Sequence, residues 1–140
     1  MDSLCGASPG LLIAVKEFCE HFPPLKSPEI AKGRCKMYSY ELAKYLMRCG
    51  YSPSIVHVQE IATKHDWPTS LWKESPQNLW THYVVICGNV VIDLTGRQFD
   101  SGCSVPRICT KAQLDTEWTK VEPDEFLNKV LHEHHEAGLT

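Results

Sequence analysis

The sequence predicts a single domain of the α+β class, in which helices flank a central group of antiparallel strands. Three observations support this fold class. Apolar residues recur at helical spacing near both ends, the segments between them have the composition of strands, and Gly88-Asn89 marks a tight turn between two apolar runs. The 140 residues suit one domain with its own core, and no repeat or linker divides residues 1-140.

Two helices are expected in the first third of the chain. Ser8 caps the first helix, Pro9 occupies its first turn, and Pro23 ends it. The second helix covers residues 35–49, and Gly50 is its expected terminator. The apolar stripe of the first helix consists of Leu11, Val15, Phe18 and Phe22.

The middle of the chain is expected to form strands. Residues 54–61 predict one strand, residues 82–87 and 90–95 predict a hairpin, and a further short strand is expected within residues 98–110. Residues 64–80 have no clear period and hold three tryptophans, which argue against disorder. We expect this segment to be a covering loop or a wall of a substrate site.

A last helix is expected to begin at Pro123, since a proline suits the first turn. Asp124 and Glu125 carry negative charge where the helix dipole favours it. The buried stripe of this helix is expected to consist of Phe126, Leu127, Val130 and Leu131.

The composition excludes several classes of function. The net charge is -3 and no run of Lys and Arg occurs, which argues against a nucleic-acid binder. No apolar run approaches the ~18 residues that cross a membrane, and the N-terminus lacks the basic region of a signal peptide. We therefore expect a cytoplasmic monomer without a cofactor, without nucleic-acid or membrane contacts. Signal-independent export into a host is the alternative.

The seven cysteines have no CxxC spacing, so a zinc cluster is not expected and a reducing compartment is the simpler interpretation. Six of them are expected to be inert core or loop residues: Cys5, Cys19, Cys49, Cys87, Cys103 and Cys109. Three histidines near the C-terminus raise the hypothesis of a metal site, but a solvated helix end is the favoured interpretation: His132, His134 and His135.

The hairpin predicts that His82 and Asp93 are neighbours. A two-residue loop places Cys87 opposite Val90, and side chains alternate along each strand. His82 and Asp93 then project from the same face as diagonal neighbours within side-chain reach. A loop with one residue more or less would turn one strand over and separate them. In the paired arrangement, the carboxylate holds the imidazole in one tautomer and stabilises its cation.

Cys35 supplies the third expected catalytic group. A cysteine at the start of a helix lies near the positive end of the helix dipole, which favours its thiolate. Backbone N–H groups at that end are suited to hold a developing oxyanion. Thiol, imidazole and carboxylate together are the parts of an activated sulfur nucleophile. Cys35 shares a helix face with Ser39, Leu42 and Leu46.

Three segments resemble the papain-like and transglutaminase-like superfamily of thiol enzymes. They are RCKMYSYELAKYL with Cys35, HYVVICG with His82, and VVIDLTGRQF with Asp93, in the superfamily's chain order. The resemblance covers roughly residues 33–99. The pattern is similar to that of bacterial or phage toxins and effectors that are thiol hydrolases or glutamine deamidases. It implies a nucleophile helix packed on an antiparallel sheet.

The resemblance implies acyl chemistry through a thioester on a peptide or protein substrate. Cys35 is then the nucleophile, His82 the general base and acid, and Asp93 the group that orients the imidazole. Peptide hydrolysis, glutamine deamidation, amide hydrolysis and acyl transfer all remain open. Substrate contacts are expected at Gly33, Arg34, Gln59, Trp72 and Trp80, of which Gln59 and Trp80 are candidate oxyanion donors by position only. The alternative is a binding or inhibitory module of the same fold that has lost turnover.

Overall fold

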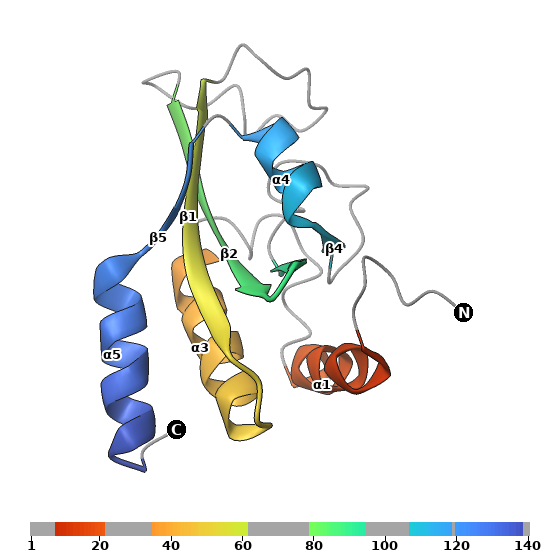
Figure 1. Ribbon diagram of the computed structural model, residues 1–140, viewed down its shortest axis with the longest axis vertical. Coiled ribbons are helices and arrows are strands. Elements are labelled where there is room, and N and C mark those ends of the chain that lie inside the picture. The colour runs from red at the N-terminus through yellow and green to blue at the C-terminus, as the bar shows by residue number, and fades with distance from the viewer. Residues whose placement is uncertain (1–7, 22–34, 62–78, 95–106, 119, 139–140) are drawn as a thin grey trace.

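The computed structural model describes four helices and five strands (Figure 1). The described residues are 8–21, 35–61, 79–94, 107–118 and 120–138. The elements are α1 (Pro9–Glu20), α3 (Cys35–Arg48), β1 (Pro53–Ile61), β2 (Leu79–Cys87), β3 (Val90–Asp93), β4 (Arg107–Thr110), α4 (Lys111–Glu117), β5 (Lys120–Pro123) and α5 (Glu125–Glu136). The chain is therefore α+β, as the sequence predicts.

The five strands form one sheet in the order β4-β3-β2-β1-β5, and every neighbouring pair is antiparallel. The long strands β1 and β2 lie at its centre and pair from Pro53 opposite Cys87 to Ile61 opposite Leu79. β3 pairs with β2 only over Val85–Cys87 in the part of the chain that the structure describes. Within the described residues, more strands therefore lie side by side at the end where the hairpin turns than beside the start of β2.

Two apolar cores lie on opposite faces of this sheet, because side chains alternate along β1 and β2. On one face, Ile55 and Val85 pack with the helices α1, α3 and α5. On the other, Val56, Val58 and Val84 pack with α4 and with Trp118, which follows it. Figure 1 shows α3 and α4 on either side of the central strands. Among the described helices, none combines the length and the apolar composition needed to cross a membrane.

Local signals explain where the helices begin and end. The Ser8 hydroxyl accepts a hydrogen bond from the Leu11 amide at 3.2 Å, which confirms the predicted cap of α1. Gly50 has a φ of 92°, so it ends α3 in a conformation that glycine adopts without strain. The predicted helix over residues 35–49 is thus confirmed, with Arg48 as its last residue.

The start of α5 lies two residues later than predicted. Pro123 is the last residue of β5, and Asp124 is the cap that accepts a hydrogen bond from the Leu127 amide at 2.8 Å. Proline lacks an N–H group, so it suits an edge strand end as well as a helix start, and the sequence pattern does not separate the two.

Two further predictions were wrong in part. Phe126 is 70% exposed, whereas Leu127 and Leu131 are buried, because α5 turns its first apolar residue away from α3 and β1. β2 begins at Leu79, so Trp80 belongs to a strand rather than to the predicted loop of residues 64–80. Residues 64–78 of that loop lie outside the described residues, as do Phe22 and Pro23.

Two elements were not predicted, α4 and β5. α4 starts with a capping box in which Thr110 and Gln113 satisfy each other's backbone amides. The predicted strand within residues 98–110 is confirmed as β4, directly before α4.

Asn128 fixes α5 to the edge of β1. Its carboxamide accepts a hydrogen bond from the Ile55 amide at 2.8 Å and donates one to the Ile55 carbonyl at 3.0 Å. The Asp124 amide also donates to that carbonyl, at 2.9 Å. Asn128 therefore extends the pairing of β1 with β5 by means of a side chain.

Candidate active site

His82 and Asp93 form a hydrogen-bonded pair on the α4 face of the sheet. His82 Nε2 lies 2.8 Å from Asp93 Oδ1, and the two residues are 0% and 5% exposed. The pair exists because Cys87 lies opposite Val90 across a two-residue turn, the register that the sequence predicts. Gly88 has a φ of 62° in that turn, which suits the tight hairpin.

The hydrogen bond determines which ring nitrogen can act as a base. An ionised carboxylate only accepts hydrogen bonds, so the Nε2 atom facing Asp93 carries a proton. The lone pair of the neutral ring is then on Nδ1. A carboxylate that orients an imidazole and stabilises its cation is the arrangement found in thiol and hydroxyl nucleophile sites. The geometry of this pair suits general base chemistry through Nδ1.

Trp118 covers the imidazole. Its ring stacks on His82 with centroids 5.9 Å apart and an angle of 21° between the planes, and Trp118 is buried. The ring excludes water from one side of the pair, and an aromatic face also attracts a cationic ring. Trp118 was not predicted from the sequence, because the signal that indicates its position is the capping box of α4.

The surroundings of the pair are apolar. Val58 lies directly opposite His82 on β1, and Val84 and Leu114 belong to the same core. In such surroundings the attraction between imidazolium and carboxylate is stronger than in water, and separating the two groups is costly. The pair is therefore also a structural element of the α4 face.

Cys35 is the first residue of α3, and its side chain lies outside the described part of the structure. The neighbouring Lys36 has its Nζ 5.9 Å from the centroid of the Tyr83 ring, which brings the start of α3 beside the residue that follows His82. Tyr83 and His82 nevertheless project from opposite faces of β2. The structure thus brings together two of the three predicted catalytic groups and begins α3 across the sheet from them.

The predicted substrate contacts fall in different places. Gln59 of β1 lies opposite Thr81 of β2. It follows Val58 along the strand, so its side chain projects from the α3 face and not from the face of His82. A direct contact of Gln59 with the His82 imidazole is therefore not expected. Trp80 of β2 lies opposite Glu60 of β1, and the Trp80 side chain lies outside the described part of the structure. Three further predicted contacts lie entirely outside the described residues: Gly33, Arg34 and Trp72.

Cys87 and Cys109 occupy core positions and Cys49 lies in the turn after α3, as expected, whereas Cys19 lies in α1. Burial raises the pKa of the Cys87 thiol to about 11, which keeps it protonated and unreactive at neutral pH. Cys109 is also buried, Cys19 is half-buried and Cys49 is exposed. Cys5 and Cys103 lie outside the described residues.

The C-terminal histidines do not form a metal cluster in the described part of the chain, where no group of three metal-ligating side chains is found. His132 and His135 are exposed. His134 Nδ1 lies 2.9 Å from the Tyr40 hydroxyl and joins α5 to α3. This contact gives His134 a structural position between the two helices.

The described residues of the candidate site share one main feature. The strongest feature is the buried pair of His82 and Asp93 beneath Trp118. In comparisons with known proteins, no protein-family model, no curated protein and no solved structure matches this chain.

Proposed function

We propose that this protein is a thiol enzyme that cleaves an amide bond of a peptide or protein through a thioester on Cys35. The observation that carries the proposal is the buried contact of 2.8 Å between His82 and Asp93. A histidine held by a carboxylate with its second nitrogen directed elsewhere has the form of a general base. The order of the elements adds support, since a helix that begins with cysteine precedes the strands of the pair.

The start of α3 favours an ionised thiol at Cys35. α3 has 14 residues and no acidic side chain in its first turn, so the positive end of its dipole is not offset there. Lys36, the next residue in the chain, carries a second positive charge. Both effects stabilise a thiolate, and backbone N–H groups of the first turn are suited to bind the oxyanion of a tetrahedral intermediate.

The route from the thiol to the imidazole passes the open side of β2. β3 is paired with β2 only as far as Val85, so within the described residues no strand flanks His82 on that side. The proposed triad therefore requires a group at the start of α3 to reach the imidazole around this edge rather than through the sheet.

The proposed reaction proceeds in two halves. The Cys35 thiol passes its proton to His82 and its sulfur bonds to the amide carbon, and the carbon–nitrogen bond then breaks as the leaving amine or ammonia takes that proton. Water next bonds to the thioester carbon and gives a proton to the imidazole. The carbon–sulfur bond breaks, and His82 returns the proton to sulfur. Transfer to an amine instead of water follows the same path.

This reaction belongs with a papain-like or transglutaminase-like fold, which we propose as the finer description of the α+β domain. Protease, amidase and glutamine deamidase activities share the thioester and differ in the acyl group that enters. The proposed chemistry needs no cofactor, and a monomer in the cytoplasm would suffice for it.

Alkylation by iodoacetamide tests the nucleophile. We expect Cys35 to react faster than the exposed thiol of Cys49 at pH 6, because an ionised thiol is the reactive form. Peptide mass spectrometry of the time course measures both rates in one sample, and Cys49→Ala is the matched control variant. A rate at Cys35 equal to or below that at Cys49, in protein with an unchanged circular dichroism spectrum, would refute the assignment.

Incubation with cell extract tests the thioester itself. Intact-mass analysis of the wild type should reveal an acyl adduct that Cys35→Ala lacks, and the added mass identifies the acyl donor. An adduct that persists in Cys35→Ala would place the chemistry on another residue.

One observation favours a second candidate, a binding or inhibitory module without turnover. The His82–Asp93 pair is buried on the face opposite α3, which is the arrangement of a structural ion pair. If the pair is only structural, Cys35→Ala will leave the biological effect of the protein unchanged.

A further inference from the structure

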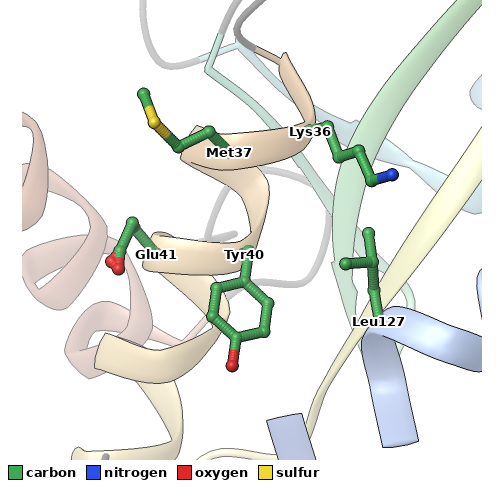
Figure 2. A pocket seen from close by; sticks show the side chains of 5 residues that line it. All are labelled: Lys36, Met37, Tyr40, Glu41 and Leu127. Carbon is green, nitrogen blue, oxygen red and sulfur yellow. The ribbon is translucent and has the colours of Figure 1, made fainter. Parts of the chain in front are cut away.

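A groove between α3 and α5 is separate from the His82–Asp93 pair. It has a volume of about 450 Å³, within the range of small-ligand sites. Figure 2 shows its lining, which comprises Lys36, Met37, Tyr40 and Glu41 of α3 and Leu127 of α5. The groove lies at the first turns of α3, directly after Cys35 in the chain.

The lining of this groove is mostly apolar, and one of its side chains, Met37, is exposed. Met37 is 51% exposed, whereas Phe126, which is 70% exposed, precedes Leu127 in α5 and does not line the groove. Ile13 on α1 is the third large apolar side chain that is exposed among the described residues. The groove therefore has one freely accessible apolar contact, Met37, above the largely buried side chain of Leu127.

The polar atoms of the groove already have partners, with one exception. The Tyr40 hydroxyl is 2.9 Å from His134 Nδ1, and Glu41 forms an ion pair with Lys44 at 3.2 Å. Lys36 contacts the Tyr83 ring, and within the described residues no carboxylate pairs with its ammonium group. The groove therefore offers an apolar floor with a positive charge at one end, and the positive end of the α3 dipole adds to that charge.

From this arrangement we propose that the groove binds a peptide segment in which a large apolar side chain lies next to an acidic one. The apolar side chain lies against Met37 and Leu127, and the carboxylate pairs with Lys36. The inference names the class of peptide presented to Cys35, so its meaning for catalysis rests on the proposed function. Binding itself does not require turnover and is measured without it.

Methyl NMR of the full chain tests this directly. The sequence has three methionines, so a protein with ¹³C-labelled methionine methyl groups gives few signals, and Met37→Leu identifies that of Met37. The probe is a Gly- and Ser-based decapeptide with Leu-Leu-Glu at its centre, added to the Cys35→Ala protein. We expect the Met37 methyl signal to shift on titration and the Met47 signal to stay in place.

Two peptides and three variants define the contacts. Replacing the leucines of the peptide by alanine, or its glutamate by lysine, should weaken binding. Met37→Ala should lower the affinity about three- to ten-fold by removing apolar contact, and Lys36→Glu about five-fold. Ile13→Ala, at an equally exposed apolar side chain on α1, should leave the affinity unchanged.

Three outcomes would overturn the inference: an unchanged Met37 signal at millimolar peptide, equal affinity for the glutamate and lysine peptides, and a Met37 shift that follows protein concentration without peptide. The last would identify a second copy of the chain as the occupant. Peptide binding with no thioester on Cys35 would contradict the proposed function alone. A thioester with no peptide binding would contradict this inference alone.

Discussion

The two histidines at the centre of the sheet differ in their contact with a carboxylate. His57 of β1 and His82 of β2 each stack on an aromatic ring, Tyr83 at 4.7 Å and Trp118 at 5.9 Å between centroids. His82 also meets the carboxylate of Asp93 at 2.8 Å and is buried, whereas His57 is half-buried on the α3 face. Stacking is therefore common to both histidines, and the carboxylate is what distinguishes the candidate base.

The same difference separates the two faces of the sheet. The α3 face is a continuous apolar core with helices on it, and its charged groups lie at the periphery. The α4 face is smaller and encloses an ionisable pair among valines and Trp118. Burial of charge is costly unless the partners stay together, so the α4 face depends on the pair more than the α3 face depends on any polar contact.

Asp93→Ala should have the largest effect on stability, because it leaves His82 buried without its carboxylate. We expect a loss of about 3–5 kcal/mol in the free energy of unfolding, measured by urea denaturation at pH 7. The matched control is Asp115→Ala, which removes an exposed ion pair with Lys111 and should cost less than about 0.5 kcal/mol. Equal losses in the two variants would show that the buried pair has no special weight.

Asp93→Asn sharpens the result. An amide oxygen can still accept a hydrogen bond from Nε2, so the loss of stability should be smaller than in Asp93→Ala. The charge is gone, however, and fast alkylation of Cys35 should be lost if the proposed triad operates. A stable Asp93→Asn protein with unchanged alkylation kinetics would separate the pair from the thiol.

The pair could be predicted from the sequence because a hairpin converts chain positions into spatial positions. Gly88-Asn89 sets a two-residue turn, the turn sets the register, and alternation assigns His82 and Asp93 to one face. No long-range information is needed for this step. The cap at Ser8 and the stop at Gly50 are local for the same reason.

The face of the sheet that α3 covers could not be predicted in that way. The spacing of Ser39, Leu42 and Leu46 identifies the buried side of the helix, and all three are buried. It carries no information about which face of β2 they meet, because both faces of the central strands are apolar. α4 and β5 were missed since each is short, and within α4 only Leu114 is buried among the described side chains.

Asn128→Ala tests the docking of α5 on the α3 face, where we expect an intermediate effect. It removes both hydrogen bonds to the backbone of Ile55 and should cost about 1–3 kcal/mol of stability. Hydrogen exchange of the Ile55 amide should accelerate with it. Gln113→Ala, in the exposed capping box of α4, is the control and should cost no more than about 1 kcal/mol. An unchanged exchange rate at Ile55 would mean that the α5 contact does not protect β1.

The smallest effect is expected at His57 and concerns pH. Burial lowers the pKa of His57 below 6.5, and the nearby Lys120 and Lys36 act in the same direction, while Asp124 and Glu122 oppose them. As pH falls below 6.5, the unfolded chain takes up a proton that the folded chain resists, so this histidine makes the free energy of unfolding decrease. His57→Phe retains a ring beside Tyr83 and should flatten that decrease between pH 6.5 and 5. Urea denaturation at several pH values measures the slope, and identical slopes in wild type and variant would contradict the assignment.

A flatter slope in His57→Phe, together with the large loss in Asp93→Ala, would mean that the two faces of the sheet stabilise a stacked histidine in different ways. The α3 face holds it as a neutral ring, and the α4 face holds it as the partner of an acid.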